Sequence, residues 1–114
     1  MSDAGSRRDI TLVFGASGYI GSNLVPFLRR QGRRVRAVSR NRAVLEGREW
    51  VDVDCASADA LQPDTLAAVL RDVDVAYYLV HSMAAGANFS ELDLQAAANF
   101  RDAAARAGIR RIIY

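Results

Sequence analysis

Three glycines at three-residue intervals, Gly15, Gly18 and Gly21, follow a short apolar run and precede a stretch with helical periodicity. Gly15 permits a tight turn that a side chain would obstruct, Gly18 lets a phosphate approach the backbone, and Gly21 lets the helix pack closely on the strand. The amino terminus of that helix presents free N–H groups and a partial positive charge. A strand, a glycine turn and a helix in this order predict a site for the pyrophosphate of a dinucleotide.

Residues between and beside these glycines complete the predicted turn, and the Ser17 hydroxyl can donate one further hydrogen bond. The alternative interpretation is a strand-to-helix turn that is purely structural. The cofactor-binding residues expected here are Gly15, Ser17, Gly18, Tyr19, Ile20 and Gly21.

The segment Ser39-Arg40-Asn41-Arg42 stands at the end of the second expected strand. Domains that prefer NAD usually carry an acidic residue about 20 residues after the glycines, where it bonds the ribose 2′-hydroxyl. An arginine there can instead pair in a bidentate manner with a 2′-phosphate. Arg40 therefore favours NADP over the alternative cofactor NAD, with Ser39 and Arg42 as helpers. The competing interpretation of Arg40 is a solvated surface arginine.

Apolar runs alternate with helical stretches along the whole chain. Strands separated by helices imply parallel βαβ units with right-handed crossovers. We therefore predict the N-terminal half of a doubly wound α/β (Rossmann) sheet with strand order 3-2-1-4-5. The expected strands are 10–14, 34–39, 49–53, 75–80 and 109–114, and the expected helices are 19–31, 63–71 and 90–107.

Three segments carry a resemblance to a known family: residues 13–21, 78–83 and 96–104. Together they resemble the extended and atypical short-chain dehydrogenase/reductases, in particular the NmrA-like, NAD(P)-binding and epimerase-like branch. The similarity extends from Ile10 to Tyr114. It implies an NAD(P)-binding domain whose parent is an NADPH-dependent oxidoreductase or an epimerase-like enzyme. Some NmrA-like proteins are non-catalytic NADP sensors or regulators, which is the alternative.

The resemblance also implies roles for two later segments. An aspartate after the third strand meets the adenine amino group in this family, which designates Asp54, with the backbone of Cys55 nearby and Asp52 as a rival. A carboxylate that merely caps a loop is the competing interpretation. The carboxyl end of the fourth strand, Leu79-Val80-His81, lines the ligand crevice at the switch point of the sheet. His81 is as readily explained as a loop residue that forms hydrogen bonds.

The catalytic machinery of short-chain dehydrogenases does not occur in these residues. Family members use a Ser or Thr after the fifth strand and a Tyr-x-x-x-Lys pair, whereas all fifteen basic residues here are arginine. We therefore expect no catalytic residue in the chain, an incomplete C-terminal side of the domain, and a small-molecule substrate that these residues do not identify. The unfinished fifth strand is expected to support homo-oligomers through its open edge.

Composition excludes several other classes of protein. The 114 residues allow one small domain, and a net charge of +2 gives no indication of nucleic-acid binding. One cysteine and one histidine exclude an internal disulfide and a structural zinc site. No apolar run approaches the roughly 20 residues of a membrane span. We expect a cytoplasmic protein with a disordered tail over residues 1–9 and the dinucleotide domain over residues 10–114.

Overall fold

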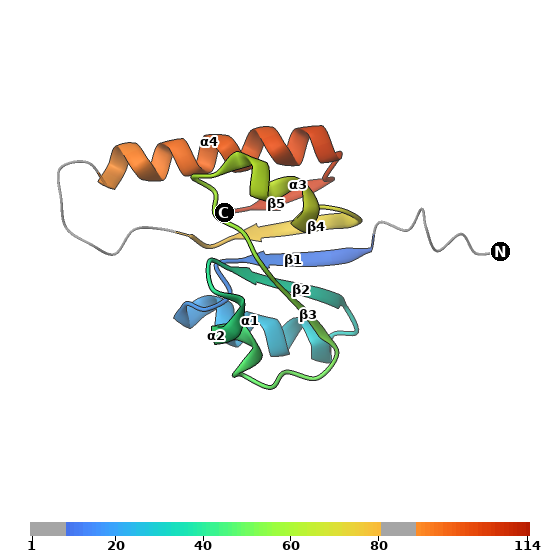
Figure 1. Ribbon diagram of the computed structural model, residues 1–114. Helices are drawn as coiled ribbons and strands as arrows, with labels where there is room; N and C mark the ends of the chain where they lie inside the picture. The colour runs from blue at the N-terminus through green and yellow to red at the C-terminus, as the bar shows by residue number, and fades with distance from the viewer. Residues whose placement is uncertain (1–8, 81–88) are drawn as a thin grey trace.

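The computed structural model describes residues 9–80 and 89–114. Most of the expected tail, the expected loop at 83–88, and His81 therefore lie outside the described residues. The described chain forms a five-stranded sheet with helices on both faces (Figure 1). In chain order the elements are β1 (Ile10–Phe14), α1 (Tyr19–Arg30), β2 (Arg34–Ser39), α2 (Arg42–Glu46), β3 (Val53–Ser57), the 3₁₀ turn η2 (Pro63–Thr65), α3 (Leu66–Val69), β4 (Val73–Tyr78), α4 (Phe89–Ala107) and β5 (Arg111–Ile113).

All strand pairs are parallel, and the order across the sheet is β3-β2-β1-β4-β5. The predicted fold class and strand order are confirmed. β1 lies in the middle, and all five of its residues are buried, because helices cover both of its faces. β1 and β4 consist largely of β-branched and aromatic residues, which suit a buried parallel sheet.

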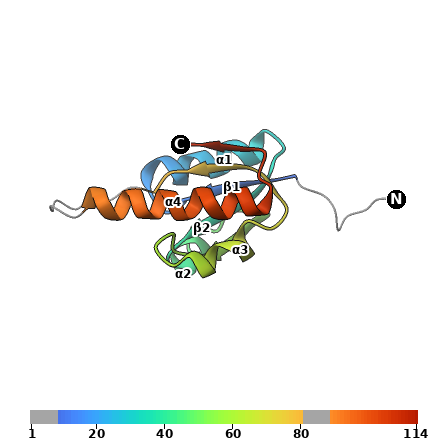
Figure 2. The same ribbon diagram turned by 90° about the horizontal axis from the view of Figure 1, so that it is seen from above.

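Two hydrophobic cores lie on opposite faces of the sheet. α1 and α2 cover one face, and α3 and α4 cover the other (Figure 1). Figure 2 shows the long α4 lying along the strands on its face. Phe100 of α4 is fully buried there, and its ring packs against those of Phe14 and Tyr78 at centroid distances of 4.9 and 4.8 Å. Val25 of α1 is the fully buried counterpart on the other face.

The prediction of a third strand at 49–53 is wrong. β3 begins at Val53, because Glu49 and Asp52 adopt positive φ angles of 56° and 58° and the chain turns between them. Positive φ is incompatible with an extended strand. The apolar pair Trp50 and Val51 suggested a strand, yet the paired residues are the small ones that follow.

For the helices, the predicted boundaries differ less from the observed ones. The five-residue helix α2 was not predicted, although Asn41 caps its first turn by accepting a hydrogen bond from Ala43 N at 3.0 Å. The helix expected at 63–71 is shorter and begins as a 3₁₀ turn. The expected helix ends at Gly32 and Gly108 are confirmed, since both glycines adopt positive φ directly after a helix.

Parallel strands bring all their C-terminal ends to one side of the sheet. We call this side the carboxyl edge; it comprises the residues that follow Phe14, Ser39, Ser57 and Tyr78. The opposite side, where these strands begin, is the amino edge. The glycine turn therefore lies at the carboxyl edge, beside the ends of β2 and β4.

Candidate functional site

Gly15 leads the chain from β1 into a turn that is packed between two neighbouring strands. The backbone N–H groups of Gly15 and Ala16 both donate to Val38 O of β2, at 2.9 and 3.0 Å. On the other side, a Cβ atom at Gly15 would lie 3.0 Å from the carbonyl carbon of Leu79 and 3.2 Å from Val80 Cγ2. The φ angle of +97° also favours glycine. The turn therefore gathers Leu79 and Val80 beside Gly15.

Gly21 sets how closely α1 approaches the turn. A Cβ atom there would lie 2.5 Å from Gly15 O and 2.8 Å from Ala16 Cα, which are backbone atoms with no room to move. The Ser22 hydroxyl fastens the same contact by donating to Ala16 O at 3.0 Å. Gly21 is thus a packing glycine, as its position in the motif predicts.

Gly18 is the N-cap residue of α1. Unlike Gly15 and Gly21, it has room for a Cβ atom. A Cβ atom there would meet only Gly15 O, at an ordinary 3.6 Å, and its φ of −74° suits any residue. No side chain caps the helix, and its first turn holds no acidic residue. The N–H groups of Tyr19, Ile20 and Gly21 have no partner within the helix, as in any first turn. A side chain at Gly18 would therefore meet no steric obstacle in the described residues.

The side chains of the predicted corner after β2 have separate roles. The Ser39 hydroxyl donates to Asn41 O at 2.8 Å and accepts from Asn41 N at 3.1 Å, so it shapes the turn. Arg42 forms an exposed ion pair with Glu46 at 2.9 Å on its own helix. Arg40 is exposed, and within the described part of the chain its side chain has neither a hydrogen bond nor an ion pair.

Sequence reasoning missed a second arginine at this edge. Arg48 follows α2, and its Nη2 donates to Ser17 O of the glycine turn at 3.2 Å, across 31 residues of sequence. Neither periodicity nor motif spacing indicates this contact, because it depends on where the unpredicted helix α2 places the chain. Arg48 and Ser17 are both exposed.

Asp54 and Cys55 do not lie where the prediction placed them. Both are inside β3, paired in register with Arg36 and Ala37 of β2. The Asp54 carboxylate accepts a hydrogen bond from Arg36 Nε at 2.8 Å, on the side of the sheet where Arg36 also bonds the carbonyls that precede β4. Their placement after the third strand was therefore wrong, and the geometry gives Asp54 a structural partner away from the carboxyl edge.

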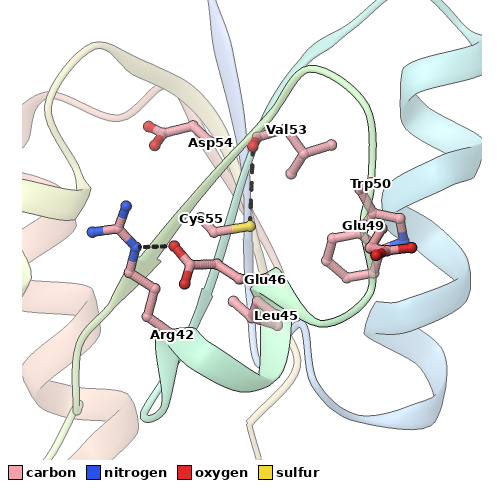
Figure 3. A pocket seen from close by; sticks show the side chains of 8 residues that line it. All are labelled: Arg42, Leu45, Glu46, Glu49, Trp50, Val53, Asp54 and Cys55. Carbon is pink, nitrogen blue, oxygen red and sulfur yellow. Dashed lines mark hydrogen bonds and ion pairs between the residues drawn. The ribbon is translucent and has the colours of Figure 1, made fainter.

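Cys55 lines a hollow of about 290 Å³ between α2 and β3 (Figure 3). Burial raises the pKa of the Cys55 thiol, and the carboxylates of Glu46 and Asp54 raise it further against the opposing effect of Arg42. A raised thiol pKa leaves little thiolate at neutral pH, so Cys55 is a poor nucleophile. Figure 3 shows Arg42 and Glu46 paired at one side of this hollow.

The acidic residue that follows β3 at the carboxyl edge is Asp59. The preceding residue, Ala58, donates its N–H to Ser39 O at 3.1 Å, which holds the chain beside the end of β2. The Asp59 carboxylate accepts the N–H of Leu61 at 2.9 Å, and its backbone is tied to Thr65. A third strand placed four residues too early led sequence reasoning to Asp54 instead.

Burial raises the pKa of Tyr78 to about 12, with smaller contributions from Asp93 and Tyr114, so this phenol stays protonated. Over residues 9–80 and 89–114 there is no cluster of metal-ligating side chains. In the same residues, no helix combines the length and the apolar character that a membrane span requires.

Comparison with known proteins agrees with this geometry. A family model described as NAD(P)H-binding matches residues 15–114, and no curated protein sequence matches the chain. Among solved structures, the protein gox2253 superposes with a TM-score of 0.79 at 27% identity, covering 93% of this chain and 33% of its own.

Two further solved structures are similar to this chain. The anaerobillin reductase ChuY of Escherichia coli O157:H7 superposes with a TM-score of 0.71 at 25% identity, covering 90% of this chain and 48% of its own. The dTDP-glucose 4,6-dehydratase DesIV of Streptomyces venezuelae, a double mutant with NAD bound, gives 0.75 at 23% identity, with 90% and 37% covered. The chain thus spans between a third and a half of these structures.

Proposed function

Because the chain belongs to the NAD(P)H-binding family, we propose that it holds NADPH at the carboxyl edge of its sheet, as the dinucleotide-binding part of an oxidoreductase. The observation that carries the proposal is the uncapped start of α1 beside Gly18. A phosphate accepts hydrogen bonds from just such free N–H groups and interacts favourably with the helix dipole.

The glycine turn also fits a bound pyrophosphate sterically. Packing within the protein accounts for the absence of a side chain at Gly15 and Gly21, whereas nothing in the described residues excludes one at Gly18. Asp or Asn would cap α1 better than glycine does. A glycine at this position is explained by a ligand that approaches the backbone and takes the place of the cap.

Neighbouring residues supply the remaining contacts of the proposed site. Arg40 offers a guanidinium without a carboxylate partner in the described chain to the 2′-phosphate, which is the basis for NADP over NAD. Asp59, rather than Asp54, takes the adenine-facing role that the resemblance assigns to an aspartate after the third strand. The backbone of Leu79 and Val80 passes beside the turn and would contact the riboses.

The chemistry of the parent protein follows from its cofactor. NADPH supplies a hydride to an electrophilic carbon of the substrate. In this chain the described residues bind and orient the dinucleotide. One similar structure is named as a reductase and another as a dehydratase. We favour the reductase class, because an arginine at the 2′-phosphate selects NADPH.

The sharpest test replaces Gly18 by Asp and by Asn. Both residues are good N-caps, so the free energy of unfolding should stay the same or rise slightly in each variant. The carboxylate introduced by G18D would face the pyrophosphate, and we expect this variant to lose NADPH binding by calorimetry. G18N has nearly the same size without the charge, and it should retain more affinity than G18D.

Equal NADPH affinity in the G18D variant and the unchanged chain would refute the proposed site. Loss of binding together with a large loss of stability would instead assign Gly18 a structural role. A thermal unfolding curve of each variant without cofactor separates these two outcomes.

A further inference from the structure

Asn99 of α4 is hydrogen-bonded to a loop that lies far from it in the sequence. Its Nδ2 atom donates to Ala60 O at 2.7 Å, across 39 residues, and Ala60 directly follows Asp59 at the carboxyl edge. A second bond orients the Asn99 amide, because its Oδ1 atom accepts from Gln95 Nε2 at 2.9 Å, one helical turn earlier. Asn99 is therefore held with its donor group on the loop that carries Asp59.

The peptide unit between Ala60 and Leu61 is bonded at both of its polar ends. Its carbonyl oxygen accepts from Asn99, and its N–H, which belongs to Leu61, donates to Asp59 Oδ1 at 2.9 Å. Because a peptide unit is planar, fixing the direction of its carbonyl also fixes the direction of its N–H. Hydrogen bonds in such a series polarise and strengthen one another. We call this series, from Asn99 through the peptide to the Asp59 carboxylate, the relay.

Other contacts of the loop fix the backbone of Asp59 but leave its side chain to the relay. The Asp59 N–H donates to Thr65 Oγ1 at 3.0 Å, and Ala58 before it is bonded to Ser39 O. Within residues 9–80 and 89–114, the carboxylate forms no ion pair, and Leu61 N–H is its hydrogen-bond donor. The direction of this N–H therefore decides how the carboxylate is oriented, and it leaves the second oxygen, Oδ2, available to a ligand.

We propose that Asn99 is a positioning residue, which orients the Asp59 carboxylate toward the adenine amino group through the relay. This inference rests on the proposed function and adds to it a residue of α4, which contributes no other residue to the proposed site. An amino group donates hydrogen bonds and a carboxylate only accepts them, so a fixed carboxylate distinguishes adenine from a base with a carbonyl at the same position. The purely structural alternative is that Asn99 only satisfies the carbonyl of Ala60, which is 3% exposed.

The test compares two dinucleotides that differ in one group of the base. In deamino-NADPH, hypoxanthine replaces adenine, so a carbonyl oxygen takes the place of the amino group and would repel the Asp59 carboxylate. Calorimetry gives the ratio of the two dissociation constants, which is the base preference, for the unchanged chain and each variant. Asn99→Ala and Asn99→Asp both remove the donor to Ala60, and the second keeps the size of the side chain.

The control for lost stability is Ala103→Gly, which removes a buried methyl group from the same helix and lowers its helix propensity without touching the relay. Thermal unfolding curves without cofactor show how far each variant is destabilised, and binding is measured at a temperature at which all of them are folded. Asp59→Ala is the positive control, because it removes the carboxylate itself.

We expect the unchanged chain to bind NADPH about tenfold or more tightly than deamino-NADPH, because a hydrogen bond to a charged group corresponds to a ratio of that size. Both Asn99 variants should reduce this preference to about threefold or less, chiefly by weakening NADPH. Ala103→Gly should lower the thermal stability and keep the preference, and Asp59→Ala should abolish it.

Four results would overturn the relay. An unchanged preference in both Asn99 variants, whether or not their affinities fall, would leave Asn99 the structural role of satisfying the Ala60 carbonyl. An equal loss of preference in Ala103→Gly would trace the effect to lost stability. A preference that survives in Asp59→Ala would also remove Asp59 from the proposed site, while NADPH binding at the glycine turn would stand. If the unchanged chain binds neither dinucleotide, the proposed function fails as well.

Discussion

The arginines at the two edges of the sheet have different surroundings. At the amino edge, Arg34 pairs with Asp9 at 2.6 Å and Arg36 with Asp54 at 2.8 Å, and Arg29 lies 3.6 Å from Asp52. The three arginines border a hollow of about 380 Å³ together with Asp52 and Asp54. At the carboxyl edge, Arg40 and Arg48 have no carboxylate partner in the described chain.

The presence or absence of a carboxylate partner distinguishes arginines that stabilise the fold from arginines that are available to a ligand. Arg34 and Arg40 belong to one six-residue strand and the residue that follows it, yet one is neutralised and the other is not. A cation that is paired within the protein offers little to an external anion, whereas an exposed, unpaired guanidinium attracts one. The contrast therefore predicts opposite phenotypes for substitutions at the two edges.

The largest expected effect comes from Gly21 at the carboxyl edge. Gly21→Ala places a methyl group against Gly15 O and Ala16 Cα, so α1 must move away from the turn. We expect a loss of about 3 kcal/mol or more in the free energy of unfolding, measured in urea. Gly18→Ala is the control and should lose less than about 1 kcal/mol. Equal losses would show that the close approach of α1 is unimportant.

At the amino edge, Arg36 is expected to matter for stability alone. Its side chain is 13% exposed and bonds Asp54, Val69 O and Arg71 O, so Arg36→Gln removes three charge-assisted hydrogen bonds. We expect a loss of about 2–4 kcal/mol in the free energy of unfolding. NADPH affinity, measured under conditions in which the variant is folded, should stay unchanged. A selective loss of NADPH binding would break the contrast between the edges.

Arg40 is expected to show the reverse behaviour. Arg40→Ala should leave the free energy of unfolding within about 0.5 kcal/mol. Losing a charge-assisted contact to the 2′-phosphate costs about 1.5–3 kcal/mol, or roughly tenfold to a hundredfold in NADPH affinity. NADH affinity should be nearly unchanged. If both cofactors weaken alike in a parallel titration, Arg40 stacks on the adenine ring and is not a phosphate ligand.

The ionic strength provides a second test of the role proposed for Arg40. The contact between Arg40 and the 2′-phosphate is ionic and partly exposed, so added salt should screen it. Raising the ionic strength from about 0.1 M to about 0.5 M should weaken NADPH more than NADH in the unchanged chain, and the difference should shrink in the Arg40→Ala variant. A difference of the same size in both proteins would place the salt-sensitive contact elsewhere.

The smallest effect is expected for Arg34. Its pair with Asp9 is exposed on both sides, and exposed pairs contribute little because solvent and salt screen them. Arg34→Gln should change the free energy of unfolding by about 0.5 kcal/mol or less and leave the affinity for both cofactors unchanged. A large loss of stability would show that the charges around the amino-edge hollow act as a network.

Much of the fold was predictable from local signals. An apolar run, three evenly spaced glycines and a stretch with helical periodicity predict the strand β1, a turn and the helix α1 in this order. The alternation of strands and helices then led to the order β3-β2-β1-β4-β5 through the handedness of parallel crossovers. The dependence of the turn on Gly15 and Gly21 was equally accessible, because it is a matter of backbone conformation and steric room.

The register of β3 and its consequences were decided by tertiary structure. Residues 49–57 contain apolar residues in both halves, and only pairing with β2 selects Val53–Ser57. Because β3 begins four residues later than predicted, the acidic residue that follows it at the carboxyl edge is Asp59 and not Asp54.

The partners of the arginines were likewise beyond sequence reasoning. Within α2, Arg42 has Glu46 one helical turn away, a local relation that the sequence contains. The contact of Arg48 with Ser17 joins residues 31 positions apart. The amino-acid sequence determines how many arginines the chain carries. Only folding determines which carboxylate or carbonyl each arginine contacts, because ion pairs and hydrogen bonds depend on distance in space.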